Sequence, residues 1–172
     1  LSISIQSYPQ MGWACRDGLH CRAEEKRKGG MPDLIEHGSG EYEETVALRH
    51  QVLRKPLGLS YEPAELAGEK DSFHLALREG TELVACLVLK PLDEQRCIKM
   101  RQLAVRENVQ GKGFGRELVN YAESFLKGRG YEEIVLHARE TARGFYEKLG
   151  YEAEADSFTE VGLPHLIMRK KF

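Results

Sequence analysis

The stretch QLAVRENVQGKGFGREL, residues 102–118, places three glycines in five positions, at Gly111, Gly113 and Gly115. It begins as an apolar, strand-like segment and continues into a pattern with helical periodicity. Each glycine costs conformational entropy on folding, so the three predict either an awkward turn of the backbone or the close approach of a large anion. A turn that only docks a helix on a sheet is the simpler interpretation.

The helix that follows the glycines supports the anion interpretation. The first amides of a helix lack partners within it, and the helix dipole favours negative charge at that end. Glycines remove the Cβ atoms that would keep phosphate oxygens away, and Lys112 and Arg116 add positive charge. The pattern therefore favours a phosphate cradle over a plain turn.

The spacing of the loop excludes two common phosphate-binding loops. A dinucleotide fold needs G-x-G-x-x-G after the first strand of a parallel sheet, whereas this loop reads G-x-G-x-G and the strands before it read as a hairpin. A Walker loop needs Gly-Lys followed by Ser or Thr, but Lys112 is followed by Gly113.

The rest of the chain predicts an α+β domain on one mostly antiparallel sheet. Helical periodicity predicts helices over 41–54, over 114–127, and over a third stretch with Ala142, Phe145, Tyr146 and Leu149 on its inner face. Residues 55–71 read as a loop or a broken helical turn. The predicted strands cover residues 73–79, 83–92, 96–105, 133–138, 151–158 and 165–170.

Two finer expectations follow from the same patterns. Strict alternation in the 96–105 strand places Ile98, Met100, Gln102 and Ala104 on one face, and Lys99, Arg101, Leu103 and Val105 on the other. Gly150 stands where a left-handed helix cap is expected, with Tyr151 as its apolar partner.

The totals describe an ordinary globular chain. Its 172 residues suit one domain, with 41% hydrophobic and 30% charged residues. A net charge of −2 supplies no field for nucleic acid or an anionic membrane. Of the four cysteines, Cys15 and Cys21 are spaced C-x5-C beside His20, which matches no common zinc pattern, so we expect no metal. The thiols suit a reducing cytoplasm.

Residues 1–30 differ from the rest of the chain. They show no sustained periodicity, contain the charge run RAEEKRKGG, and precede Met31, which reads like a natural beginning. We interpret them as a peripheral or poorly ordered extension; an interaction arm is the functional alternative. The expected domain covers residues 31–172.

The loop Gln110-Gly111-Lys112-Gly113-Phe114-Gly115 resembles the Q/R-x-x-G-x-G/A loop of the GCN5-related N-acetyltransferases, the GNAT family. ARGFYEKLGYE, downstream, is similar to the family's A-x-x-F-Y-x-x-x-G-F/Y segment, and VGLPHLIMRKKF resembles the last strands of small bacterial members. The resemblance covers roughly residues 33–172. It implies a sheet of six to seven strands, with helices on both faces, that splays open after the 96–105 strand.

What the resemblance implies for the site is a bound acetyl-CoA. Its pyrophosphate would lie on the amides of residues 110–116, from Gln110 through Gly115 to Arg116. Its pantetheine would lie along the Leu103-Ala104-Val105 strand, pairing with backbone groups of Leu103 and Val105. A backbone N–H of this strand would stabilise the oxyanion.

The resemblance also implies a catalytic acid at Tyr146, which occupies the family's Phe-Tyr position, because a phenol can return a proton to the departing sulfur. A core tyrosine is the structural alternative. Three residues remain open as the general base, together with water: Glu160, His165 and His137.

The implied reaction is transfer of an acetyl group from acetyl-CoA to a primary amine by direct attack. A non-catalytic acyl-CoA-binding or regulatory module on the same fold is the first alternative, and an unrelated phosphate-binding α+β protein is the second. The acceptor is a small-molecule or peptide amine. Arg49, His50 and Arg54 could select an acidic one, or form a solvated face. A homodimer is compatible with the sequence.

Overall fold

The computed structural model describes residues 30–92 and 96–172. The extension expected over 1–30 therefore lies outside the described residues, apart from Gly30, and so do Cys15 and Cys21.

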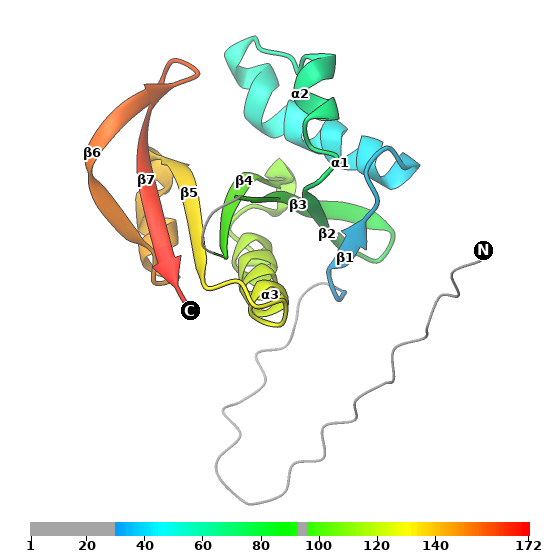
Figure 1. Cartoon of the computed structure of the whole chain (residues 1–172). Helices are drawn as coiled ribbons and strands as arrows, with labels where there is room; N and C mark the ends of the chain where they lie inside the picture. Colours follow the sequence, from blue (N-terminus) through cyan, green and yellow to red (C-terminus); the bar gives the residue numbers. More distant parts are fainter. Residues whose placement is uncertain (1–29, 93–95) are drawn as a thin grey trace, which may run out of the picture.

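One seven-stranded sheet forms the centre of the fold, in the order β1-β2-β3-β4-β5-β7-β6 (Figure 1). Every neighbouring pair is antiparallel except β4 and β5, which run parallel. The strands are β1 (Asp33–Ile35), β2 (Phe73–Glu79), β3 (Glu82–Pro91), β4 (Cys97–Val105), β5 (Glu133–Arg139), β6 (Glu152–Glu160) and β7 (Leu163–Lys171).

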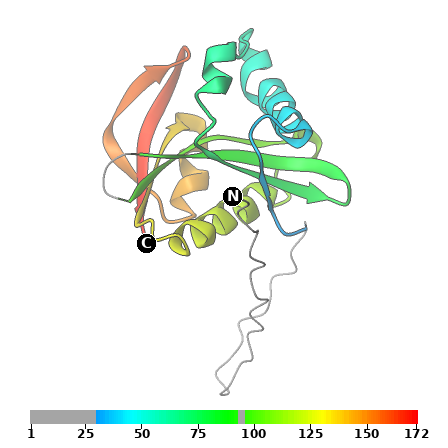
Figure 2. The same cartoon turned by 45° about the vertical axis from the view of Figure 1, so that its right-hand side comes forward.

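Helices cover both faces of the sheet, so the predicted α+β architecture is confirmed (Figure 2). Helix α3 packs on one face in the larger core, and α1 packs on the other face in the smaller core. The helical segments are α1 (Gly40–Arg49), the π-helical turn η1 (His50–Arg54), η2 (Lys55–Leu57), α2 (Pro63–Ala67), η3 (Glu107–Val109), α3 (Phe114–Lys127), η4 (Glu140–Ala142) and α4 (Arg143–Glu147).

The sheet opens between β4 and β5, as expected. The two strands pair from Cys97 with Glu133 as far as Met100 with Leu136, and the rest of β4 has no partner on that side. Backbone groups of β4 beyond Met100 are therefore available to a ligand.

Local chemistry explains where the two long helices begin and end. The Ser39 hydroxyl accepts a hydrogen bond from the Tyr42 amide at 3.1 Å and so caps α1. Helix α3 follows Gly113, which is left-handed, and ends at Gly128. Gly150 has a φ of +85° and the Tyr151 amide donates to the Tyr146 carbonyl, which confirms the predicted cap.

The predicted faces of β4 are wrong beyond Arg101. Gln102 has a φ of +55°, and the register with β3 shifts by one residue at this point, which marks a β-bulge. Because the bulge inserts an extra residue, Leu103 and Val105 pack with the α3 core, and Ala104 packs with the α1 core. Leu103 and Val105 thus share a face with Ile98 and Met100, where strict alternation predicted Ala104.

Strand β1 was not predicted, because three residues carry too little periodicity. Helix α2 lies inside the segment expected as a loop or broken turn. Among residues 30–92 and 96–172, none of the helices combines the length and apolar character that crossing a bilayer requires.

Candidate active site

The three glycines of the loop have two different roles. Gly111 has a φ of +75° and Gly113 a φ of +99°, and a Cβ on either would meet no atom within 4 Å. Both therefore make a turn that faces open space. Gly115 has no such φ, but a Cβ there would lie 3.3 Å from the Val105 side chain and 3.6 Å from the Phe145 ring. It lets α3 approach the sheet.

The loop and the first turn of α3 present free backbone donors. The Gln110 and Lys112 amides donate to the carbonyls of Glu107 and Val109, and the Gln110 side chain donates to the Val105 carbonyl at 3.0 Å. Five other amides find no acceptor in the part of the chain that the structure describes, namely those of Gly111, Gly113, Phe114, Gly115 and Arg116. Such a cluster of donors suits an anion.

A groove of ≈ 460 Å³ runs from this loop along the splayed part of β4. Most of the predicted site residues line it: Leu103, Val105, Gln110, Gly111, Gly113, Phe114, Gly115, Arg116 and Tyr146. Lys112 is exposed beside the loop and does not line the groove, and the Ala104 side chain is buried on the opposite face.

The backbone of β4 faces the gap at two residues. The Arg106 amide donates to the Val84 carbonyl at 2.9 Å. Because ladder bonds alternate along an antiparallel pair, Ala104 makes the next bonds to β3, and the backbone groups of Leu103 and Val105 point away from β3 toward β5. The backbone groups of Leu103 and Val105 therefore lie on the side of β4 where the resemblance implies the pantetheine.

A second cavity, of ≈ 270 Å³, lies on the other side of the gap. We call it the acceptor cleft. Segments from η1, β4, β5 and the β6–β7 hairpin form its walls, and the charged and histidine side chains that line it are Arg54, Lys99, Arg101, His137, Arg139, Glu160 and His165. The tip of the hairpin, including Val161 with a φ of +46°, closes one wall.

Tyr146 lines both cavities, together with Leu103 and Ala142. The Tyr146 side chain is 8% exposed and its ring packs on Phe145 and Tyr151. Burial raises the pKa of its phenol above the ordinary value, so the phenol is protonated at neutral pH. A protonated phenol at the junction can give a proton to a group in either cavity.

The structure brings all three candidates for the general base into the acceptor cleft. Lys99 Nζ lies 3.0 Å from His137 Nε2, and Glu160 Oε2 lies 2.9 Å from His137 Nδ1. Because an ammonium can only donate, His137 accepts at Nε2 and donates from Nδ1 to the carboxylate. His165 donates from Nδ1 to the Leu163 carbonyl at 2.9 Å.

The Glu160 carboxylate is charged in this arrangement. Burial alone would raise the pKa of Glu160, but its hydrogen bond with His137 outweighs burial and lowers the pKa below the ordinary value. Within residues 30–92 and 96–172, no group of three or more His, Cys, Asp or Glu side chains is placed to hold a metal ion.

The comparisons with known proteins agree with this geometry. The model of the acetyltransferase (GNAT) family matches residues 40–151. The chain belongs to this family.

Relatives and solved structures extend the match beyond that segment. YyaT of Bacillus subtilis, described as an uncharacterized protein, is 33% identical over 135 residues, which cover 74% of this chain and 91% of YyaT. YitI of the same organism, described as an uncharacterized N-acetyltransferase, is 26% identical over 143 residues, or 80% of this chain and 96% of YitI. A Bacillus subtilis acetyltransferase solved in complex with CoA shares the fold, with a TM-score of 0.64 at 19% identity, over 82% of this chain and 97% of that one.

Of the three residues that the sequence raised either as contacts of an acidic acceptor or as a solvated face, two do not reach the cleft. Arg49 is fully buried and binds Glu69, and His50 is absent from the residues that line the cavity. Arg54 does line it. The expected alternation of β4 did separate Lys99 and Arg101 from the core, but nothing in the sequence indicated that they face the acceptor side.

Proposed function

We propose that this GNAT protein transfers the acetyl group of acetyl-CoA to a primary amine by direct attack. The observation that carries the proposal is the position of Tyr146 and Leu103, where the groove and the acceptor cleft meet. An acetyl group held in the groove and an amine held in the cleft would meet beside these two residues.

The loop fits the diphosphate of acetyl-CoA. The free amides around Gly111 and Gly113 supply donors, and the open space where their Cβ atoms would stand leaves room for phosphate oxygens. Arg116 lines the same groove and adds charge. The exposed Leu103 and Val105 backbone groups would hold the pantetheine amides in extended form.

Acetyl-CoA supplies a thioester carbonyl that a neutral amine can attack. In the proposed mechanism the Leu103 N–H, which points into the gap, stabilises the negative charge that develops on the carbonyl oxygen. The Tyr146 phenol donates a proton to the departing sulfur. The ionised Glu160 carboxylate, held by His137, accepts the proton of the amine, directly or through water.

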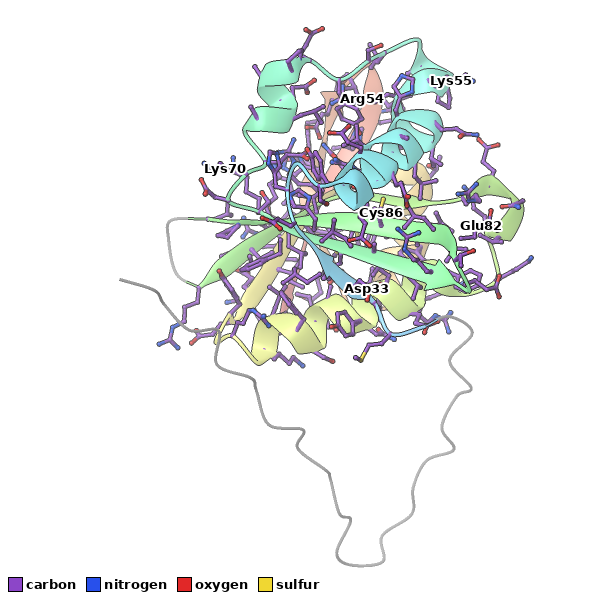
Figure 3. The ribbon with its side chains drawn as sticks, turned by 90° about the vertical axis from the view of Figure 1, so that its right-hand side faces the viewer. Asp33, Arg54, Lys55, Lys70, Glu82 and Cys86 are labelled. Carbon is purple, nitrogen blue, oxygen red and sulfur yellow. The ribbon has the colours of Figure 1, made fainter. Side chains whose placement is uncertain are left out.

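The reaction belongs in a reducing compartment, and we propose the cytoplasm. Cys86 and Cys97 are buried, unbridged thiols among the described residues. Figure 3 shows Cys86 under α1, where burial raises its pKa to about 12 and keeps the thiol protonated.

The Tyr146→Phe variant tests the chemistry. We expect it to bind acetyl-CoA as the wild type does in isothermal titration and to lose about 100-fold or more in acetyl transfer, because only the acid is removed. Tyr151→Phe is the matched control, since Tyr151 packs on Tyr146 but lines neither cavity. Unchanged turnover in Tyr146→Phe would remove this residue from the mechanism.

A non-catalytic acyl-CoA-binding module would behave differently. It would bind acetyl-CoA in the groove and release no thiol with any amine. No observation favours this alternative, because the cleft beyond the groove is lined with titratable groups that such a module would not need.

A further inference from the structure

The acceptor cleft concentrates positive charge in a protein whose net charge is −2. Four cationic side chains line it, all half-buried: Arg54, Lys99, Arg101 and Arg139. Glu160 is the carboxylate among the lining residues. Since the molecule as a whole is slightly acidic, this charge is a property of the cleft.

Three of these cations have partners within the protein. Arg54 pairs with Glu65 at 2.9 Å, and Arg139 donates to the Leu53 carbonyl at 3.0 Å. Lys99 contacts His137. These contacts fix the side chains in place and, apart from Glu65, neutralise little of their charge.

Arg101 differs from the other three. Across residues 30–92 and 96–172 its guanidinium makes no ion pair. The charge of Arg101 reaches Glu65, whose pKa is lowered first by a backbone hydrogen bond from Glu62 and then by Arg54 and Arg101. The Arg101 guanidinium is thus free to bind a ligand with its full fork of donors.

The pKa of Lys99 also reflects the positive charge in the cleft. Burial lowers its pKa, and the charges of Arg101 and Lys90 lower it further, while Glu160 acts in the opposite direction. An additional cation in the cleft would be repelled, and an anion would be attracted.

We propose that the acceptor is a small primary amine that carries a carboxylate, and that Arg101 binds this carboxylate with Arg54 beside it at the cleft wall. The inference rests on the proposed acetyl transfer. An arginine binds a carboxylate through two parallel hydrogen bonds, which gives both affinity and orientation. The volume of ≈ 270 Å³ suits a small molecule, because the pockets that bind drug-sized ligands measure about 300–1,000 Å³.

Glu160 provides the complementary half of the site. Its carboxylate lies on the hairpin strand β6, whereas Arg101 lies on β4. In the proposed binding mode, the amino group of the acceptor faces the His137–Glu160 pair and the carboxylate of the acceptor faces Arg101. Arg54 is labelled in Figure 3 and lies on the face of the sheet that α1 and α2 cover. It lines the acceptor cleft on that face.

Matched amines test the proposal in the 172-residue chain. The first set is 4-aminobutyrate, butylamine and 1,4-diaminobutane, whose far ends are a carboxylate, a methyl group and a second amine. The second set is L-aspartate and L-asparaginamide, in which carboxamides replace the two carboxylates. With acetyl-CoA present, we expect kcat/KM to be about tenfold or more higher for the carboxylate member of each set. Equal use of the members, or preference for the diamine, would overturn the proposal.

Two variants assign the preference to a residue. We expect Arg101→Gln to lose most of the preference, mainly through a higher KM for 4-aminobutyrate. Arg96→Gln is the control, because Arg96 lies in an exposed turn, paired with Glu132. A carboxylate preference that survives in Arg101→Gln would contradict the assignment.

Binding separates this inference from the proposed function. If no amine releases thiol, the proposed function fails, and isothermal titration of 4-aminobutyrate and butylamine into the CoA-saturated protein decides the inference. Binding of 4-aminobutyrate alone, lost in Arg101→Gln, would support the anion site. Absence of that binding would overturn it.

Discussion

At the scale of single residues, the loop glycines separate into two kinds. Gly111 and Gly113 adopt positive φ and face open space, whereas Gly115 avoids a contact with Val105. The sequence raised a turn and an anion approach as alternatives. The turn is observed at Gly111 and Gly113, and the same turn exposes the amides that would bind phosphate in the proposed function.

The Gly111→Ala variant tests the cradle. Gly130 is the matched control, because its φ of +79° is close to the +75° of Gly111 and a Cβ there also meets nothing within 4 Å. Each alanine costs about 1 kcal/mol of stability from the left-handed backbone. In isothermal titration we expect only Gly111→Ala to weaken acetyl-CoA binding, by about tenfold or more. Equal affinity in the two variants would place the cofactor elsewhere.

Single residues also show where sequence reasoning stops. The loop and Tyr146 could be found because each belongs to a motif with characteristic spacing. Arg49 could not be separated from Arg54 in this way, because both lie in one helical pattern. Burial decides between them: Arg49 is 0% exposed, and Arg54 lines the cleft.

At the scale of elements, a buried polar cluster ties α1 to the bulge in β4. The Arg49 guanidinium makes two hydrogen bonds to Glu69, at 2.9 and 3.0 Å, and a third to the Gln102 side chain. Glu69 also accepts a hydrogen bond from the Tyr42 hydroxyl at 3.0 Å. The cluster therefore contacts Gln102, whose left-handed backbone shapes the bulge in β4.

This coupling accounts for the main error in the predicted fold. Elements with strong periodicity, such as α3, β2 and β3, were predicted close to their observed bounds. The bulge at Gln102 was not, because a bulge depends on pairing with another strand and on the side chains around it, rather than on alternation within the strand. Every residue of β4 after the bulge changes face as a result.

We expect Arg49→Ala to lower the free energy of unfolding by about 3–5 kcal/mol, since it leaves Glu69 buried without its counter-charge. The double variant Arg49→Met, Glu69→Leu should recover most of this loss, because no charge remains buried. Urea unfolding of both variants measures the difference. A loss in the double variant as large as in Arg49→Ala would show that packing, rather than charge, explains the effect.

The same pair predicts how stability depends on acid. Burial alone would raise the pKa of Glu69, but the hydrogen bond and charge of Arg49 outweigh it and lower the pKa. As the pH drops below about 4, the Glu69 carboxyl takes up a proton in the unfolded state before it does so in the folded state. The free energy of unfolding therefore falls with the pH in this range. The free energy of unfolding should fall more steeply with acid in the wild type than in the double variant; parallel curves would contradict this.

At the scale of the whole molecule, the parallel pair β4–β5 divides the sheet into two parts that separate beyond Met100 (Figure 1). The gap joins the groove beside α3 and α4 to the cleft beneath η1 and the β6–β7 hairpin. The order of the elements, apart from β1 and α2, could be predicted from the sequence. The joining of two cavities at Tyr146 could not, because it depends on where pairing stops.

The most direct test of this account is release of free CoA thiol from acetyl-CoA in the presence of primary amines, with the product identified by mass spectrometry. We predict amine-dependent thiol release, a product heavier than its amine by one acetyl group, and loss of both in Tyr146→Phe. Thiol release that is the same with and without amine, or no acetylated product from any amine, would contradict the assignment of an acetyl-CoA-dependent N-acetyltransferase.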